Sequence, residues 1–187
     1  MNLPTLLTWA RIVAVPLIIG LFMLPNDMLS LAHKNLAATI MFVGAAITDA
    51  LDGYLARKWN QTSAFGAFLD PVADKLMVCA ALLLLVFLTR VHPLLALVII
   101  GREIAISALR EWMASIGHRN KVAVNSLGKF KTIAQMVAIP FLLFDGRLFS
   151  IIDTRLWGQV LLAVATILTV WSMLYYFRLA LAEVKGL

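Results

Sequence analysis

Charged residues are scarce in this chain. Only 14% of its 187 residues are Asp, Glu, Lys or Arg, 62% are hydrophobic, and the mean hydropathy is +0.92. Soluble domains carry about 25% charged residues, and a soluble fold of this size has too little interior to bury so many apolar side chains. The composition therefore excludes an ordinary soluble domain and predicts an integral membrane protein.

Cysteine, histidine and several catalytic motifs are also scarce or missing. Cys79 is the single cysteine, which excludes an intramolecular disulfide, leaves the redox compartment open and fits a small buried hydrophobe better than a nucleophile. The three histidines are far apart and lack zinc-ligand spacing. No G-x-S-x-G motif occurs, and Gly128-Lys129 lacks the rest of a phosphate-binding loop. A serine hydrolase and a nucleotide-driven pump are therefore disfavoured.

Signals for processing or for several domains are missing too. The first apolar run lacks the basic n-region of a cleavable signal peptide, so we expect the N-terminus to remain in the mature protein. The sequence has no convincing internal repeat, low-complexity tract or long linker. We expect a single domain over residues 1–187.

Six hydrophobic segments are present, each close to the ~20 residues that a helix needs to cross the hydrocarbon layer. They cover residues 5–24, 34–57, 66–89, 92–114, 127–146 and 155–178. The expected fold class is therefore all-α and integral to the membrane, with six transmembrane helices. Only the last segment has a long charge-free run, from Leu156 to Phe177, so several of the others should line a polar, water-filled cavity.

The basic residues predict the orientation. Sixteen Lys and Arg against ten Asp and Glu give a formal charge of +6, and anionic lipid head groups are the expected partner rather than nucleic acid. Eight basic residues fall on one side of the expected topology, namely Arg57, Lys58, Arg119, Lys121, Lys129, Lys131, Arg178 and Lys185. The other side has four, Lys34, Arg90, Arg147 and Arg155. The larger group should be cytoplasmic, together with both termini and the aspartate end of the second segment.

The most informative feature is acidic. Four of the seven aspartates lie close together in the sequence, Asp49, Asp52, Asp70 and Asp74. Within helices the first two share one face and the last two share another. The small residues Gly53, Ala56, Gly66 and Ala73 lie beside them. For one aspartate, a helix cap or an interfacial position would be the simpler interpretation. Four carboxylates repel one another, whereas a pair of Mg²⁺ or Mn²⁺ ions ~4 Å apart accepts such ligands and supports phosphoryl displacement.

The same stretch resembles the signature of the CDP-alcohol phosphotransferase family, D-x2-D-G-x2-A-R-x8-G-x3-D-x3-D. Every fixed position matches, at Asp49, Asp52, Gly53, Ala56, Arg57, Gly66, Asp70 and Asp74. The stretches NLPTLLTWAR, KWNQTSAFGAFLDPVADK, GREIAISALREWM and GKFKTIAQMVA are similar to bacterial members that use glycerol 3-phosphate, so the resemblance covers nearly the whole chain. It implies the six-helix fold of the family, a homodimer, and a bacterial cytoplasmic (inner) membrane location with the active site facing the cytoplasm.

The resemblance also implies a reaction. Such enzymes transfer the phosphatidyl group of CDP-diacylglycerol to an alcohol, here sn-glycerol 3-phosphate, giving phosphatidylglycerol phosphate and CMP. Asp49, Asp52 and Asp70 would ligate two Mg²⁺ or Mn²⁺ ions. Asp74 would lie at the edge of the metal site and act as the general base for the acceptor hydroxyl.

Further positions are expected to bind the substrates. Those implied for CDP-diacylglycerol are Pro4, Thr5, Gly53, Ala56, Arg57, Thr62, Ser63 and Gly66. Gly53 and Ala56 would leave room for the nucleotide, and Arg57 would contact the diphosphate. The phosphate of the acceptor requires cationic groups, for which the candidates are Arg102, Arg110, Lys129 and Lys131.

Several of these basic residues have a simpler interpretation. The two lysines are equally well explained as positive-inside anchors. Arg102 would otherwise form a salt bridge with Glu103, or with Glu111 of a neighbouring helix. Arg11 either approaches the nucleotide phosphates or extends to the interface, and Lys75 is simplest as a neutralising partner of its acidic neighbour.

Two rival functions also remain. The signature belongs to the nucleotide half of the reaction, so serine, inositol phosphate or a second phospholipid are alternative acceptors. A small cation transporter would also use intramembrane aspartates, but it predicts acidic residues spread between both faces of the membrane.

Overall fold

The structure is a computed structural model that describes residues 3–59, 64–116 and 126–184. These residues form six α-helices and one pair of two-residue antiparallel strands. In chain order the elements are α1 (Leu3–Met23), α2 (Leu31–Trp59), α3 (Ala64–Phe87), α4 (Pro93–Ser115), α5 (Ser126–Phe144), β1 (Arg147–Leu148), β2 (Ile152–Asp153) and α6 (Thr154–Val184). The predicted all-α class is confirmed, and each predicted segment corresponds to one helix.

The helix ends follow local sequence signals. Before α4, the side chain of His92 accepts a hydrogen bond from the backbone N–H of Leu94 at 3.3 Å, and Pro93 occupies the first helical position, where its missing N–H costs nothing. Before α6, the Asp153 carboxylate accepts from the N–H of Leu156 at 3.1 Å. Pro71 lies inside α3, seven positions after the helix begins.

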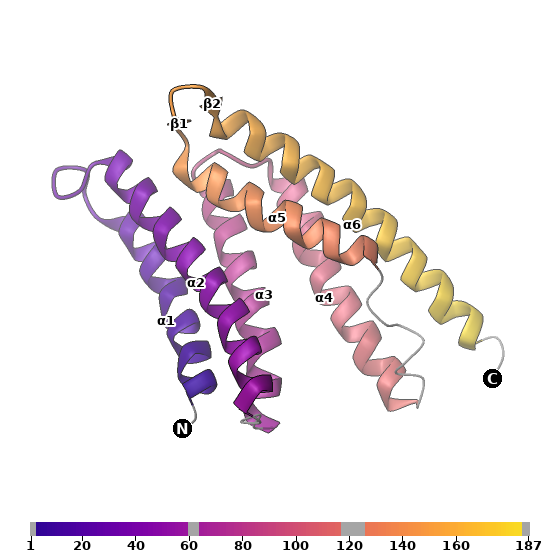
Figure 1. The fold of residues 1–187 in the computed structure, drawn as a ribbon. Coiled ribbons are helices and arrows are strands. Elements are labelled where there is room, and N and C mark those ends of the chain that lie inside the picture. The colour runs from indigo at the N-terminus through magenta and orange to yellow at the C-terminus, as the bar shows by residue number, and fades with distance from the viewer. Residues whose placement is uncertain (1–2, 60–63, 117–125, 185–187) are drawn as a thin grey trace.

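Consecutive helices run in opposite directions, so α1 begins and α6 ends at the same end of the bundle (Figure 1). α1 packs on α2 and α3, while α5 packs on α6 and on α2. α4 completes the bundle through contacts with α6 and α3. Because α2 ends and α3 begins near the start of α1, the aspartates of these two helices lie toward the end of the bundle that holds the two chain termini.

The main apolar core lies in the opposite half of the bundle. It combines side chains from α2, α3, α4 and α5 that are fully buried, among them Phe42, Leu82, Leu85, Ile99 and Ile139. In a bilayer these side chains would otherwise contact equally apolar lipid, so close van der Waals packing stabilises the helix contacts. The packed apolar core thereby holds together the helices that contain the aspartates.

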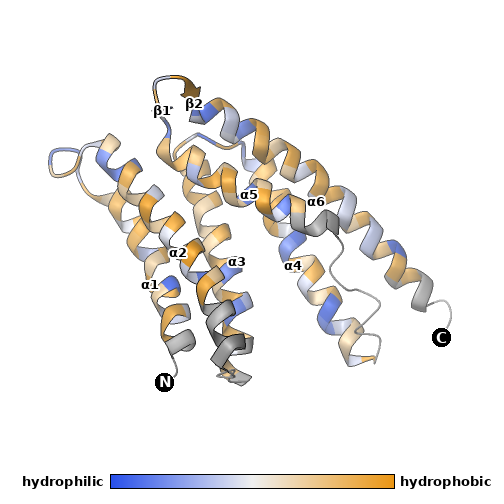
Figure 2. Ribbon diagram, in the orientation of Figure 1, coloured by the Kyte–Doolittle hydropathy of each residue, from blue (hydrophilic) through white to orange (hydrophobic). Residues whose placement is uncertain are grey.

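The outer surface of the bundle is also apolar, as the orange colour along the helices in Figure 2 shows. Leu17, Ile40, Leu83, Leu97 and Ile167 are each more than half exposed. Within the described residues, three helices contain stretches long and apolar enough to span a membrane, Leu6–Met23, Leu31–Leu51 and Thr154–Leu179, and α5 contains a shorter apolar stretch, Phe130–Phe144. The composition, the exposed apolar surface and these helices together indicate a membrane protein.

Arg90, between α3 and α4, ties three parts of the apolar half together. Its side chain is buried, donates to the carbonyls of Leu142 at 3.0 Å and Leu143 at 2.8 Å, and donates to the Asn35 side chain at 2.8 Å. Its Nε lies 3.1 Å from a carboxylate oxygen of Asp145. The two carbonyls belong to the last turn of α5, where backbone carbonyls have no N–H donor within the helix. Burial lowers the pKa of the Arg90 guanidinium from its usual value, and the negative charge of Asp145 opposes that change.

α5 and α6 approach each other closely at Gly158. A Cβ at this position would lie 2.7 Å from Cγ of Leu142 and 3.2 Å from the carbonyl oxygen of Ala138. Small residues permit such close helix contacts in membranes. Gly158 therefore sets the separation of these two helices.

Candidate active site

Arg11 lies at the centre of an acidic cluster. Arg11 is only 2% exposed, and its Nη1 donates hydrogen bonds to the carboxylates of Asp49 on α2 and Asp74 on α3. Its Nη2 lies 3.7 Å from a carboxylate oxygen of Asp70, which also accepts from the Thr8 hydroxyl at 2.5 Å. Three of the four aspartates singled out in the sequence therefore converge on one guanidinium. The side chain of Asp52 lies outside the described residues.

The charges of this cluster do not balance. Three carboxylates surround one guanidinium, which leaves a formal excess of two negative charges. The side chains of Asp49, Asp70 and Asp74 are 35%, 43% and 38% exposed, so they are reachable from outside the bundle. An open cluster of negative oxygens attracts cations.

The donor set suits a hard divalent cation. Carboxylate oxygens are the ligands that Mg²⁺ and Mn²⁺ prefer, and these three already surround a positive group. Among the described residues, no three His, Cys, Asp or Glu side chains are close enough together to hold a metal ion. This includes the three aspartates in their present positions around Arg11. Coordination would therefore require the carboxylates to turn from the guanidinium toward the ion. The residues fit the metal in chemistry and in location.

A cavity of about 180 Å³ opens beside the acidic cluster. Its walls come from α2, α3, α4 and α5 and combine the apolar side chains of Val78 and Met136 with six polar ones, those of Asp49, Asp74, Lys75, Glu103, Thr132 and Gln135. The volume is far above the ~30 Å³ that one water molecule occupies in the liquid and below the ~300–1,000 Å³ of sites for drug-sized ligands. The cavity suits a small polar compound.

A buried ion-pair network forms the wall on the α4 and α5 side. Glu103 pairs with Lys131, and its Oε1 accepts from Nη1 of Arg102 at 3.2 Å. The second terminal nitrogen of Arg102 donates to the Ser172 hydroxyl on α6 at 3.1 Å. Lys131 and Arg102 are 3% and 5% exposed, so Glu103 is the member of this network that faces the cavity.

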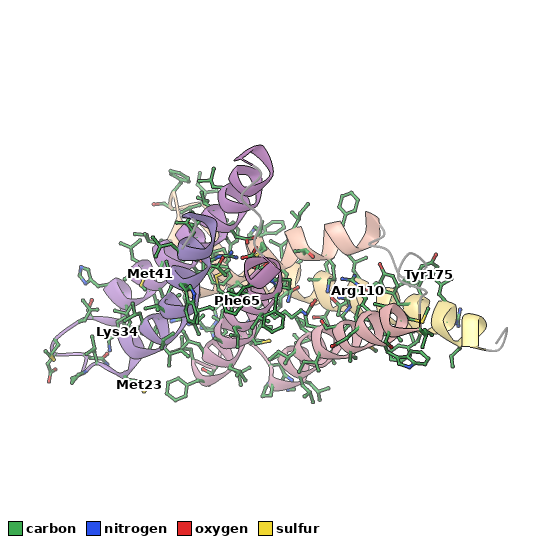
Figure 3. All side chains as sticks on the ribbon, turned by 90° about the horizontal axis from the view of Figure 1, so that it is seen from below. Met23, Lys34, Met41, Phe65, Arg110 and Tyr175 are labelled. Carbon is green, nitrogen blue, oxygen red and sulfur yellow. The ribbon has the colours of Figure 1, made fainter. Side chains whose placement is uncertain are left out.

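The structure corrects the expected arrangement of the acceptor candidates. Arg102 does not line the cavity, and its salt bridge is with Glu103 of the same helix. Lys131 is buried against Glu103, so the interpretation as an exposed membrane anchor is wrong. Arg110 is exposed, and its guanidinium lies 5.9 Å from the ring centre of Tyr176; Figure 3 places it on the α4 and α6 side of the bundle. The side chain of Lys129 lies outside the described residues.

Most positions expected to bind CDP-diacylglycerol fall outside the described side chains. Pro4 and Thr5 lie in the first turn of α1, and Gly53, Ala56 and Arg57 lie in the last turns of α2, but only their helical backbone is described. Thr62 and Ser63 lie in the connection between α2 and α3, outside the described residues. Gly66 is buried near the start of α3, one turn before Asp70.

Two more expectations have definite outcomes. Arg11 does not extend to the interface, because its guanidinium is buried among the aspartates. Lys75 lines the cavity next to Asp74. The cation that pairs with Asp49 and Asp74 is Arg11 of α1.

Three residues of the site were missed as functional candidates. Thr8 precedes Arg11 by three positions and Gln135 follows Lys131 by four, so helical periodicity places each on the same face as a residue already singled out. Glu103 had been considered only as a partner of Arg102. Helical spacing was the signal that could have found the first two.

Comparison with known proteins identifies the family. The family model described as CDP-alcohol phosphatidyltransferase matches residues 1–171, and the chain belongs to this family. Enzymes of this family generally use a divalent metal.

The curated relatives are similar over almost their whole length. A CDP-diacylglycerol--glycerol-3-phosphate 3-phosphatidyltransferase of Haemophilus influenzae is 46% identical over 181 residues, which cover 96% of this chain and 93% of the relative. The protein of the same description from Escherichia coli K12 is 46% identical over 186 residues, covering 97% and 96%. The matched region covers nearly the whole chain, so it extends over α2, α3, α4 and α5.

Proposed function

We propose that this protein transfers the phosphatidyl group of CDP-diacylglycerol to sn-glycerol 3-phosphate and releases CMP. The observation that carries the proposal is that Asp49 and Asp74 of the acidic cluster also line the small polar cavity. A donor nucleotide held at the carboxylates and a small acceptor held in the cavity would then meet at one point. The description of the near full-length relatives supports the same pair of substrates.

Asp49, Asp52, Asp70 and Asp74 would hold the divalent ions, which we propose are two Mg²⁺ or Mn²⁺. When bound, these ions neutralise the diphosphate of the donor and stabilise the charge that develops on departing CMP. Arg11 and Thr8 orient the carboxylates from the side of α1. Gly53, Ala56, Arg57 and Gly66, with Pro4, Thr5, Thr62 and Ser63, are proposed to surround the nucleotide.

Asp74 is the proposed general base. Its carboxylate lines the cavity, is 38% exposed, and is held in position by Arg11. It would take the proton of the acceptor hydroxyl while the hydroxyl oxygen attacks the phosphorus that carries the lipid. The bond from that phosphorus to the CMP oxygen breaks, and CMP leaves with the electron pair.

The acceptor phosphate needs positive charge near the cavity. Lys131, Arg102 and Arg110 lie close enough for their charges to interact with one another, and Lys129 precedes Lys131 on α5. We propose that Arg110 and Lys129 attract the phosphate directly. Lys131 and Arg102, which are buried against Glu103, would add positive charge from behind that carboxylate.

A purified-protein assay tests the reaction. The protein is supplied with CDP-diacylglycerol, with Mg²⁺ or Mn²⁺, and separately with glycerol 3-phosphate, serine or inositol phosphate, and CMP and the lipid product are measured. We expect CMP release only with glycerol 3-phosphate, and loss of activity after chelation. Activity only with another acceptor would reassign the substrate, and Mg²⁺ flux into sealed vesicles without CMP release would support a transporter instead.

We further propose that all six helices cross the bilayer, that residues 1–187 form one domain, and that the protein is a homodimer in a bacterial inner membrane. The exposed apolar surface and the opposite directions of consecutive helices support the crossings. The excess of basic residues at the end holding the aspartates supports a site that faces the cytoplasm. Labelling of single cysteines from either side of sealed vesicles tests the orientation, and chemical cross-linking in membranes tests the dimer.

A further inference from the structure

The wall of the cavity contains polar side chains to which the proposed reaction gives no role, among them Glu103 and Gln135. Glu103 on α4 and Gln135 on α5 line the same cavity as Asp74. Neither side chain belongs to the acidic cluster around Arg11. Their chemistry indicates what part of a small ligand they would contact.

Glu103 has a free acceptor position. Its contacts with Lys131 and Arg102 both use Oε1, and no described residue bonds Oε2. The two buried cations keep the carboxylate charged and fix its position, while the side chain remains 22% exposed. A fixed, charged carboxylate that lines a cavity accepts hydrogen bonds and repels anions, so it suits a hydroxyl group of the ligand and not its phosphate.

Gln135 has an unused donor. The residue is only 4% exposed, and its Nε2 has no hydrogen-bond partner among the described residues. A buried amide without a partner is unfavourable, and such groups in folded proteins normally bind something. Gln135 lies one helical turn after Lys131, the residue that holds Glu103. The donor on α5 and the acceptor on α4 therefore line the same cavity.

We infer that Glu103 and Gln135 together recognise the hydroxyl group of the acceptor that does not react. A hydroxyl donates one hydrogen bond and accepts others, so it satisfies the carboxylate and the amide at once. In sn-glycerol 3-phosphate the primary hydroxyl attacks, and the secondary hydroxyl is on the adjacent carbon. The inference rests on the proposed function, since it requires the reacting hydroxyl at Asp74 and the neighbouring one at Glu103 within the same small cavity.

The test compares two acceptors that differ only in this group. 3-Hydroxypropyl phosphate retains the primary hydroxyl and the phosphate but lacks the secondary hydroxyl. We expect the wild-type protein to prefer glycerol 3-phosphate, measured as the ratio of kcat/KM for the two compounds, and Gln135→Met to lower this ratio roughly tenfold, mainly through KM. Glu103→Gln should lower it as well.

A matched control is available on α6. Gln159 donates to the backbone carbonyl of Arg90 at 3.2 Å in the other half of the bundle, so Gln159→Met makes the same chemical change away from the cavity and should keep the wild-type ratio. Because Glu103→Gln also removes the partner of two buried cations, the decisive variant is Gln135→Met. If it lowers kcat/KM for both acceptors by one factor, the role is structural and the inference is overturned. A wild-type protein inactive with glycerol 3-phosphate would instead overturn the proposed function.

Discussion

Arg11 on α1 donates a hydrogen bond to Asp74 on α3, 63 positions later in the sequence. The same nitrogen bonds Asp49 on α2, so one atom joins the first three helices at their acidic ends. The guanidinium holds the carboxylates at one location and neutralises part of their charge.

Replacing Arg11 should destabilise the protein most when metal is absent. Arg11→Gln removes the cation among the carboxylates, and we expect the free energy of unfolding to fall by about 2 kcal/mol. That is below the ~3–5 kcal/mol for fully buried pairs, because these aspartates are 35–43% exposed. Thermal unfolding with a chelator and with Mn²⁺ measures the change, and Mn²⁺ should restore most of it. Equal losses in both conditions would contradict this role, and Arg147→Gln at an exposed position is the control.

Asp74→Asn should retain nucleotide binding and abolish transfer. The amide keeps the shape of the side chain but cannot accept the proton, so kcat should fall by about 10²–10⁴-fold. Binding of CDP-diacylglycerol and turnover with glycerol 3-phosphate are the two measurements. Turnover near that of the wild type would exclude Asp74 as the base.

Arg110→Ala should weaken the use of the acceptor. The side chain lies over the Tyr176 ring and its charge acts on Lys131, so its loss should raise the KM for glycerol 3-phosphate roughly tenfold with little change in that for CDP-diacylglycerol. Initial rates over both substrate concentrations separate the two effects. An unchanged dependence on the acceptor would remove Arg110 from the acceptor pocket.

Arg90→Met should reduce stability without a specific effect on either substrate. The substitution leaves two carbonyls of α5, the Asn35 side chain and Asp145 without their partner. We expect a loss of about 3–5 kcal/mol, measured by thermal unfolding in detergent. Arg155→Met is the control. The Arg155 side chain is 49% exposed and its Nη1 lies 3.9 Å from Oδ1 of Asp145, and an exposed, long ion pair of this kind contributes about 0–1 kcal/mol. Similar losses for both variants would contradict the assigned role of Arg90.

Gly158→Ala should separate α5 from α6. The new methyl group would lie 2.7 Å from Cγ of Leu142, and overpacking of this kind costs about 1–3 kcal/mol. Gly101→Ala serves as the matched control, because its Cβ would have no neighbour within 4 Å. The midpoint of thermal unfolding should fall for the first variant and not for the second. A midpoint at or above that of the wild type for Gly158→Ala would show that Leu142 can move away freely.

The helices could be predicted because their length and apolar character are local properties of the sequence. All six begin within three positions of the predicted boundaries, but α6 ends at Val184, six positions after the predicted Arg178. The short strand pair was missed for a local reason. Its connection contains Phe149 and Ser150 at φ 51° and 61°, a conformation that usually requires glycine or asparagine.

The acidic part of the site could be predicted, and its cationic partners could not. Spacing within one helix identified Asp49, Asp70 and Asp74, because residues three or four positions apart share a face. Arg11, Arg90 and Glu103 depend on which helices become neighbours, and one sequence does not contain that information. For this reason Arg90 was counted as a loop charge, although it is buried between helices.

The buried guanidinium of Arg11 also has a consequence for biogenesis. A membrane protein with an acidic site of this kind must insert its carboxylates into the bilayer region before divalent ions have bound to them. Since this chain carries its own positive group on α1, which precedes α2 and α3 in the sequence, those two helices can assemble around it as they emerge. Ion supply would then limit turnover and not assembly of the bundle.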